Sequence, residues 1–416
     1  MRAPRNLLLL TIDAWRADFT DRYAGVALTP NLGLRAAHTA RFERVWANGP
    51  WTSPGLVPMF NGRSPARDGI ITADWTPPAG VPSLAGTFAA AGHHVPNLCY
   101  LSQVGNYLNL GYPPHTALPY PKAPDDPVLF DGLSDAATRG AQPFFAWYHY
   151  KFVHLPYWPE APYRRALGVD DTMLPARLRD SVCREFVVPR AQFPLEPTAD
   201  ADAVRRLYAA GVLRMDAWLG EVFAHLDRLG LTESTTIVVT ADHGDELLER
   251  GHVGHASTAE HASLHEEVLR IPLFVIDSRI DGLRRRPERV QGLDLFPTLL
   301  ALAGLDPPPG AAIDGVDVST LALAPERFVA PPGFETRPFL FHSARMGYRT
   351  PPELHGHAQF GLSDGRHKVV VEHYENTRVA LYDLIRDPGE TAPASHGPEV
   401  DAAAVRLAAA FATPMA

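Results

Sequence analysis

Residues 235–245 read TTIVVTADHGD, a run of β-branched residues that passes directly into acidic and imidazole side chains. Such a run is typical of a buried strand, because branched side chains fit a pleated surface. Residues 6–12 (NLLLLTI) form a second apolar run, and Asp13 follows it. Ligands of open parallel sheets gather at the carboxyl ends of the strands. The two segments therefore predict neighbouring strands with a site at their ends.

Strands and helices alternate on both sides of these segments. Residues 143–150 and 271–277 read as strands, and residues 203–229 and 293–304 read as helices. This alternation predicts an α/β fold with a large, mainly parallel sheet covered by helices. Beyond about residue 305, short strand-like segments dominate, and a last helix is expected at about residues 400–411. We therefore expect a catalytic domain over residues 1–325 and a small antiparallel α+β subdomain over residues 326–416.

The composition describes a soluble globular protein. The chain has 416 residues, of which 46% are hydrophobic and 20% charged, and its formal net charge is −9. A negative chain is a poor partner for nucleic acid, whose phosphates require basic surfaces. Two distant cysteines, Cys99 and Cys183, argue against a disulfide framework or a cysteine-based zinc site. No segment approaches the roughly 18 apolar residues that span a bilayer, so we expect no membrane partner and a cytoplasmic location.

The residues that follow the predicted strands form a candidate metal site. Asp13, Asp242 with His243, and His154 each come just after such a strand. Taken alone, each has a simpler interpretation as a turn or cap residue, but their shared sheet edge weakens it. One imidazole among carboxylates favours zinc or manganese over calcium, which prefers oxygen ligands.

Two further groups of residues leave alternatives open. Four histidines follow the DHG segment, and we expect only one or two of them to act: His252, His255, His261 and His265. Thr52 and Ser53 precede Pro54 and resemble a helix N-cap. A helix start also binds anions through its free N–H groups, so capping and catalysis are compatible. A hydroxyl there would become a nucleophile beside a metal held by Asp13 and Asp242.

The chain resembles the sulfatase branch of the alkaline phosphatase superfamily. The resemblance rests on blocks in family order: NLLLLTIDAWRAD (6–18), TPNLGLRAA (29–37), WTSPGLVPMFNGRSP (51–65), TIVVTADHGDELLERG (236–251), EEVLRIPLFV (266–275), LDLFPTLLALAGL (293–305) and DGRHKVVVEHYENTRVALYDLIRDPGE (364–390). It implies an alkaline phosphatase-like sandwich with a central mixed sheet between helices and a smaller C-terminal sheet.

The resemblance also implies roles for individual residues. Asp13, Asp242 and His243 resemble the metal ligands of the family, and Thr52 stands at the position of its nucleophile, which also contacts the metal. His154, in HLPY, is similar to a histidine that binds the transferred group. His255 stands where many members carry a lysine, with His261 as a competing candidate.

Departures from the sulfatase pattern favour phosphoryl chemistry. Sulfatases carry Cys or Ser in a Cys/Ser-x-Pro-x-Arg motif that is oxidised to formylglycine, whereas this chain has Thr52 and Leu56. Sulfatases also have a second aspartate after the first and an asparagine after the later one, where this chain has Ala14 and His243. Tyr100, with Ser102 two residues later, is similar to the Tyr-x-Thr of phosphonate monoester hydrolases and phosphodiesterases.

These observations predict a metal-dependent hydrolase of phosphodiesters or phosphonate monoesters that forms a phospho-threonine at Thr52. His154 and His255 would steady the phosphoryl oxygens or protonate the leaving group, and Tyr100 would add a donor. The alternatives are a phosphoryl transferase with the same intermediate, a sulfate-ester hydrolase and a non-catalytic metal-binding homologue. One metal site is predicted, and a second would draw on further histidines: His149, His154, His255 or His261. The substrate is expected to be a small molecule, with specificity from residues 107–127 and 158–200.

Overall fold

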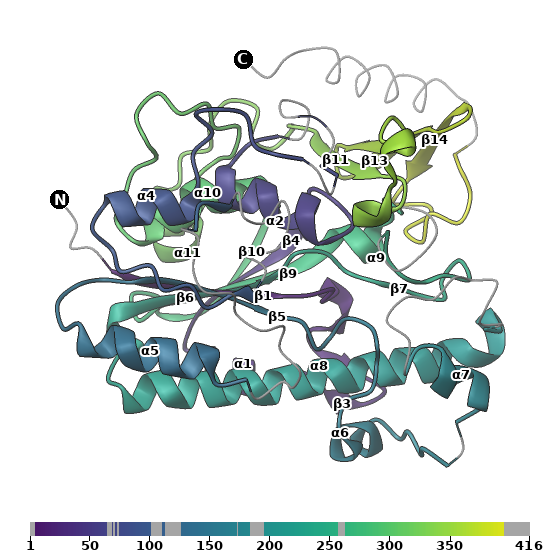
Figure 1. Cartoon of the computed structure of the whole chain (residues 1–416), viewed down its shortest axis with the longest axis horizontal. Coiled ribbons are helices and arrows are strands. Elements are labelled where there is room, and N and C mark those ends of the chain that lie inside the picture. The colour runs from purple at the N-terminus through teal and green to yellow at the C-terminus, as the bar shows by residue number, and fades with distance from the viewer. Residues whose placement is uncertain are drawn as a thin grey trace.

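The computed structural model describes residues 5–64, 69, 71–72, 75–100, 110–112, 126–172, 174–183, 195–256 and 263–394. Within these residues, six strands form a large sheet at the centre of the molecule (Figure 1). The order in the sheet is β10-β4-β9-β6-β1-β5. The strands are β1 (Asn6–Ile12), β4 (His38–Trp46), β5 (Phe145–Tyr150), β6 (Thr235–Ala241), β9 (Arg270–Ile276) and β10 (Gly282–Gln291).

Strand β1 lies between β5 and β6 and runs parallel to both. Its last residue, Ile12, is opposite Tyr150 of β5 and Ala241 of β6, so the three strands end at the same level. Strand β9 runs antiparallel to β4 and β6, while β10 is parallel to β4. The predicted large, mainly parallel sheet is confirmed, and β9 is its antiparallel member.

Helices cover both faces of this sheet (Figure 1). On one face lie α2 (Thr52–Asn61), α4 (Leu84–Ala90), α10 (Leu295–Leu302) and α11 (Ser319–Leu323). On the other lie α1 (Pro30–Gly33), α5 (Val128–Thr138), α6 (Ala161–Ala166), α7 (Ala176–Asp180) and the long α8 (Pro197–Arg228). In the described part of the chain, none of the helices combines the length and apolar character needed to cross a membrane.

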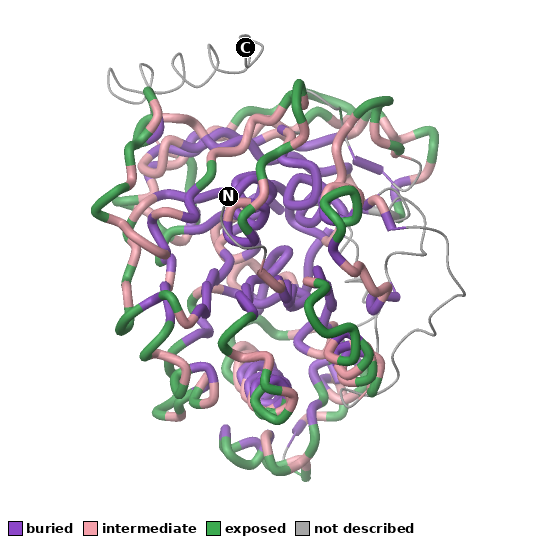
Figure 2. Tube along the Cα trace, turned by 90° about the vertical axis from the view of Figure 1, so that its left-hand side faces the viewer, coloured by how far each residue is buried: buried purple, intermediate pink, exposed green. Residues whose placement is uncertain are grey.

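The core lies between these layers, as expected for a sheet whose apolar strands are covered on both faces. Leu7, Leu8, Leu9 and Leu10 of β1 are fully buried. Figure 2 shows buried residues through the centre of the molecule and exposed residues on the outer turns and loops. The continuous apolar pattern of β1 thus matches its place in the middle of the sheet.

A second, four-stranded antiparallel sheet follows in the sequence, beside the short helix α9 (Glu266–Leu269). Its strands are β11 (Phe339–Ala344), β12 (Ala358–Ser363), β13 (His367–His373) and β14 (Thr377–Asp383). This sheet confirms the predicted C-terminal antiparallel element. The predicted last helix lies outside the described residues, and the predicted boundary at residue 325 remains a prediction. Two small hairpins complete the strands: β2 (Arg22–Tyr23) with β3 (Val26–Ala27), and β7 (Glu246–Leu247) with β8 (Val253–Gly254).

Candidate active site

Asp13 begins the loop that leaves β1, and the next residue fixes this loop in place. Ala14 has a positive φ of 61°, a left-handed conformation that costs a non-glycine residue roughly 1–2 kcal/mol. Its N–H donates to Asp242 Oδ1 (3.1 Å), and its carbonyl accepts the hydroxyl of Tyr208 on α8 (2.6 Å). These bonds hold the strained turn and join the loop after β1 to the loop after β6.

Asp242 and His243 extend from the neighbouring strand into the same space. Asp242 Oδ1 also accepts the backbone N–H of His243 (2.9 Å), so this oxygen is used by the protein. His243 Nδ1 donates to Gly244 O (2.8 Å), which directs Nε2 towards Asp242 Oδ2 (3.3 Å) and Asp13 Oδ1 (3.5 Å). The structure therefore brings the three predicted metal ligands together.

These ligand atoms fit a cation. In the described part of the chain, Asp13 Oδ1, Asp242 Oδ2 and His243 Nε2 are buried and have no hydrogen-bond partner. Leaving a buried polar atom unpaired costs about 1–3 kcal/mol, and a divalent ion would pair all three at once. One ligand atom from each of these residues can be chosen so that the three lie within 4.8 Å of one another. Buried acidic and histidine groups that could hold a divalent metal are thus present.

The two carboxylates experience opposite electrostatic environments. Burial raises the pKa of Asp242, and the negative charge of Asp13 raises it further. Burial also acts to raise the pKa of Asp13, but the imidazoles of His154, His149 and His243 outweigh it and hold that pKa below its ordinary value. Asp13 therefore favours the ionised form that a metal ligand requires.

Close packing explains the glycine of the DHG segment. A Cβ atom at Gly244 would lie 2.2 Å from the carbonyl oxygen of Glu267. The backbone N–H of Gly244 donates to Val268 O (2.7 Å), which ties the segment to helix α9. The absence of a side chain at this position allows the loop after β6 to pass against α9.

Helix α2, whose first residue is Thr52, packs against the loop after β6. A Cβ atom at Gly55 would lie 2.3 Å from Asp242 O, so the first turn of α2 is in direct contact with the Asp242 backbone. The helix begins at Thr52, which is half-buried. The first turn of α2 is therefore packed against the loop that carries Asp242.

The predicted capping role of the two hydroxyls is wrong. The N-cap is Trp51, whose backbone is extended and whose side chain makes no capping bond, so Thr52 and Ser53 are the first two helical residues. Pro54 then occupies the first turn, where its missing N–H leaves no intrahelical bond unmade. The capping pattern placed the helix start one or two residues too late.

Asp245 joins the site although the sequence analysis gave it no role. Asp245 Oδ1 accepts Nδ1–H of His255 (2.6 Å), and Oδ2 accepts the hydroxyl of Tyr157 (2.7 Å). Burial raises the pKa of Asp245 to about 6, against the effect of the nearby His154 and His243. Its position three residues after Asp242, within the DHGD segment, is the signal that could have identified it.

His154 and His255 lie face to edge, with ring centroids 4.8 Å apart, and the ring of His255 is 4.2 Å from that of His243. Burial lowers the pKa of His154, but the carboxylates of Asp13 and Asp245 outweigh it and raise that pKa. Burial, together with the charges of His243 and His154, lowers the pKa of His255. The two predicted histidines are therefore brought to the metal cluster, each with a distinct electrostatic environment.

His243, Asp245 and His255 form a second set of potential ligands within 4.8 Å. Both oxygens of Asp245 already accept hydrogen bonds, one from His255 and one from Tyr157. A second metal would have to replace these bonds. The arrangement therefore favours Asp245 as the group that orients the His255 ring.

Three further residues singled out in the sequence are Tyr100, His261 and Leu56. Tyr100 is buried in the main hydrophobic core, just before residues 101–109, which lie outside the described part. His261 also lies outside it. The roles predicted for both residues stay predictions. Leu56, at the position of the motif arginine, is fully buried in the core.

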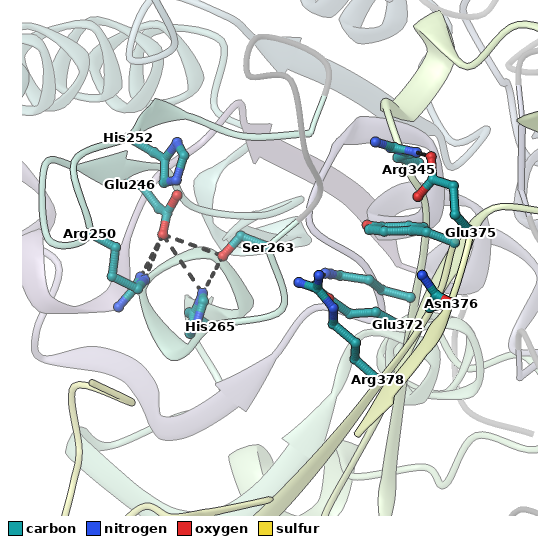
Figure 3. Close-up of a pocket in the computed structure, with 12 residues that line it drawn as sticks. Glu246, Arg250, His252, Ser263, His265, Arg345, Glu372, Glu375, Asn376 and Arg378 are labelled. Carbon is teal, nitrogen blue, oxygen red and sulfur yellow. Dashed lines mark hydrogen bonds and ion pairs between the residues drawn. The ribbon is translucent and has the colours of Figure 1, made fainter. Parts of the chain in front are cut away.

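A cavity of about 380 Å³ lies between the segment after β6 and the C-terminal sheet (Figure 3). One wall carries Glu246 with its neighbours Arg250, Ser263 and His265, and the opposite wall carries Arg345, Glu372 and Arg378. His252 and His265 face this cavity, whereas His255 of the same segment joins the metal cluster. Of the described histidines after the DHG segment, only His255 is brought to the metal cluster.

The model of the sulfatase family matches residues 5–305 of the chain. The chain belongs to the sulfatase family. This match confirms the resemblance inferred from the sequence, and the site adds buried groups suited to a divalent metal.

The curated relatives include both a multifunctional alkaline phosphatase superfamily protein and a sulfatase. The chain is 26% identical over 223 residues to the multifunctional alkaline phosphatase superfamily protein PehA of Trinickia caryophylli, covering 47% of this chain and 41% of PehA. It is 25% identical over 456 residues to human arylsulfatase A, covering 94% of this chain and 83% of that protein. The chain thus spans less than half the length of PehA.

Solved structures confirm the fold. The phosphonate monoester hydrolase of Agrobacterium radiobacter superposes with a TM-score of 0.72 at 20% sequence identity, covering 98% of this chain and 94% of that one. At this level of identity the likeness establishes the shared architecture, while the substrate depends on the residues of the site.

Proposed function

We propose that this sulfatase-family hydrolase cleaves phosphodiesters or phosphonate monoesters, with Thr52 as the nucleophile. The observation that carries the proposal is the contact between the first turn of α2 and Asp242. It supports a nucleophile beside Asp13, Asp242 and His243, whose ligand atoms are buried and unpaired within the described residues.

The proposed metal ligands are Asp13, Asp242, His243 and the Thr52 hydroxyl. A divalent cation at this position would lower the pKa of the hydroxyl and offset negative charge on the phosphoryl oxygens. The imidazole ligand favours zinc or manganese over calcium.

The residues of the chain then have the following roles. The Thr52 hydroxyl loses its proton to solvent, and its oxygen forms a bond to phosphorus while the bond to the leaving oxygen breaks. His154, whose pKa the carboxylates of Asp13 and Asp245 raise despite burial, donates a proton to the leaving oxygen and steadies the non-bridging oxygens, while His255 packs against its ring. Water then attacks phosphorus, the bond to Thr52 breaks, and the threonine oxygen regains a proton.

Two features support phosphoryl transfer over formylglycine-dependent sulfate hydrolysis. Oxidising the Thr52 side chain would give a ketone, whereas formylglycine is an aldehyde. The position of the motif arginine is occupied by Leu56, whose side chain packs in the core and supplies no charge. A site with fewer cationic groups favours singly charged substrates over phosphate dianions.

The proposal is tested with nitrophenyl esters of a phosphodiester, a phenylphosphonate, a phosphate and a sulfate, measured with zinc- or manganese-loaded protein. The diester or the phosphonate should have the highest kcat/KM. Thr52→Ala should lower it at least about 1000-fold, while Ser53→Ala should change it only a few-fold. After acid quenching, mass spectrometry should locate the covalent ester on the peptide containing Thr52.

Two results would contradict the proposal. One is an aryl sulfate turned over far faster than the phosphorus esters. The other is a Thr52→Ala variant that cleaves the diester as fast as the unaltered chain.

A further inference from the structure

His149, the last residue but one of β5, lies in the same space as the carboxylates of Asp13 and Asp242. Its side chain is 1% exposed. Its Nε2 atom is 3.4 Å from Asp13 Oδ2 and 3.9 Å from Asp242 Oδ2. In the described part of the chain, this nitrogen has no hydrogen-bond partner. A buried nitrogen beside the unpaired Asp242 Oδ2 and the carboxylate of Asp13 points to a shared ligand.

The other nitrogen of this ring is fixed by neighbouring strands. His149 Nδ1 lies 2.8 Å from Thr11 Oγ1, and Thr11 is its register partner on β1. Thr11 Oγ1 also accepts the indole N–H of Trp147 (2.9 Å). A hydroxyl oxygen can accept two hydrogen bonds, so Thr11 Oγ1 can also accept Nδ1–H from one tautomer of His149. Nε2 then carries a lone pair, which is the form of a histidine that ligates a metal.

We propose that His149 is a further ligand of the metal held by Asp13, Asp242 and His243, and that it makes this site selective for a transition metal. Zinc binds nitrogen and oxygen at about 2.0–2.2 Å, so atoms that share one ion lie about 3–4 Å apart. Asp242 Oδ2 is 3.3 Å from His243 Nε2 and 3.9 Å from His149 Nε2, and each imidazole faces its own oxygen of Asp13, Oδ1 for His243 (3.5 Å) and Oδ2 for His149 (3.4 Å).

The proposed ligand replaces one that the family pattern leads us to expect. Sulfatases resemble this chain at Asp13 but follow it with a second aspartate, where this chain has Ala14. His149 enters from the neighbouring strand, so a nitrogen ligand takes the place of a carboxylate. Two nitrogens and two carboxylates suit zinc or manganese, whereas calcium prefers a set made of oxygens.

The competing interpretation is that His149 only donates a hydrogen bond to Asp13. His149→Gln separates the two, because the glutamine amide can still donate to the carboxylate but is a poor replacement for imidazole as a metal ligand. His342→Gln is the matched control, since His342 is equally buried and is outside the cluster.

The experiment measures metal binding in the absence of substrate. The chain is stripped with a chelator, and the affinities for Zn²⁺ and Ca²⁺ are measured by competition with a chromophoric chelator. His149→Gln should lower Zn²⁺ affinity at least about 100-fold, the upper end of the loss seen for outer-shell partners, and Ca²⁺ affinity less than about tenfold. The visible spectrum of the Co²⁺-loaded variant should change, while that of His342→Gln should not.

Equal Zn²⁺ affinity and an unchanged Co²⁺ spectrum in His149→Gln would overturn the inference. If that variant fails to fold, Thr11→Val provides the test, because it removes the partner of Nδ1 and keeps the ring. Thr11→Val should lower Zn²⁺ affinity about 10- to 100-fold, and an unchanged affinity would again reject His149 as a ligand.

The inference builds on the proposed function but is tested separately from it. A loss of Zn²⁺ affinity in His149→Gln, in a chain that cleaves no phosphorus ester, would retain the ligand and reject the function. If turnover depended on Thr52 but Zn²⁺ affinity did not depend on His149, the proposed function would be retained and His149 would be rejected as a ligand.

Discussion

Two clusters of buried charge in this molecule are stabilised in different ways. At the C-terminal sheet, the buried Lys368 ammonium donates to Leu264 O (2.8 Å) and lies 2.9 Å from Glu266 Oε1 and 2.8 Å from Glu390 Oε1. Its cation comes from the chain itself. At the ends of β1 and β6, Asp13 and Asp242 form no ion pair with a lysine or arginine of the described chain.

The difference separates a structural cluster from a functional one. The charge of a buried carboxylate beside a lysine is balanced within the chain. Two adjacent buried carboxylates repel each other, and an added cation relieves that repulsion. We therefore expect the second arrangement to cost stability in the metal-free chain and a bound cation to offset that cost.

The largest effect is expected for Asp242→Asn. The amide keeps the oxygen that accepts the N–H groups of Ala14 and His243 but loses the negative charge that attracts a cation. Turnover should fall at least about 10⁴-fold, equivalent to about 5 kcal/mol of transition-state stabilisation. Stability of the metal-free protein should not fall, because a repelling carboxylate is removed.

Thermal or denaturant unfolding with and without metal checks this second part. Metal at about 100 times its Kd should stabilise the unaltered protein by about 2.7 kcal/mol and leave Asp242→Asn unchanged. A metal-free variant that is several kcal/mol less stable would show that the carboxylate is structural, which would remove the contrast between the two clusters.

Lys368→Met should lower stability and leave metal binding intact, the reverse of what is expected for Asp242→Asn. Methionine fills a similar volume, but it leaves Glu266 and Glu390 facing each other without the ammonium. Removing one partner of a buried ion pair costs about 3–5 kcal/mol, so urea unfolding should show a loss of this size. Metal affinity should stay unchanged. Arg378→Met on the exposed face of β14 is the control, with an expected change below about 0.5 kcal/mol; a similarly small change for Lys368→Met would contradict the prediction.

The sequence predicted the central strands better than the outer ones. Strand β1 was expected at residues 6–12 and is found there, because every residue in its apolar run is in a strand buried on both faces. Strands β4 and β10 were not predicted. Their sequences, HTARFERVW and GLRRRPERVQ, are rich in arginine, and they become strands through pairing with β9 and with each other. Long-range pairing of this kind leaves little local signal.

The residues of the site also differ in how well the sequence predicts them. Asp13, Asp242 and His243 were identified because each directly follows a strongly apolar strand. Asp245 depends on the conformation of a loop that brings His255 and Tyr157 to its two oxygens. His149 depends on the register between β5 and β1, which determines that its ring lies beside Thr11. Register is a property of two distant segments, so neither segment predicts it alone.

His342 of β11 represents a third way to bury a titratable group, which is to keep it neutral. Burial lowers its pKa to about 4, although a backbone contact with Asn48 acts in the opposite direction. As pH falls below the ordinary value near 6.5, the unfolded chain takes up a proton that the folded chain does not. The stability associated with His342 is therefore complete above pH 6.5 and is lost as pH falls to about 4.

His342→Phe should remove this dependence. At about 1.4 kcal/mol for each pH unit, the unaltered chain should lose roughly 3 kcal/mol more than the variant between pH 6.5 and 4. Urea unfolding at several pH values measures both slopes. Parallel slopes would show that His342 is protonated in the folded state and has found an acceptor.

A smaller loss of turnover than in Asp242→Asn, but the sharpest effect on geometry, is expected for Gly55→Ala. The added Cβ would lie 2.3 Å from Asp242 O, so the first turn of α2 must move away from the cluster. Overpacking of this kind costs about 1–3 kcal/mol. A displacement near 1 Å can lower turnover about 100-fold, while metal affinity should change less than tenfold, because Asp13 and the imidazoles stay in place.

Gly33→Ala in α1, where a Cβ meets nothing within 4 Å, is the control and should leave stability, turnover and metal affinity nearly unchanged. Equal losses of turnover and metal affinity in Gly55→Ala would mean that α2 supports the carboxylates and that Thr52 is not separately positioned. A selective loss of turnover would place the reacting group on the first turn of α2, distinct from the buried ligands that hold the cation.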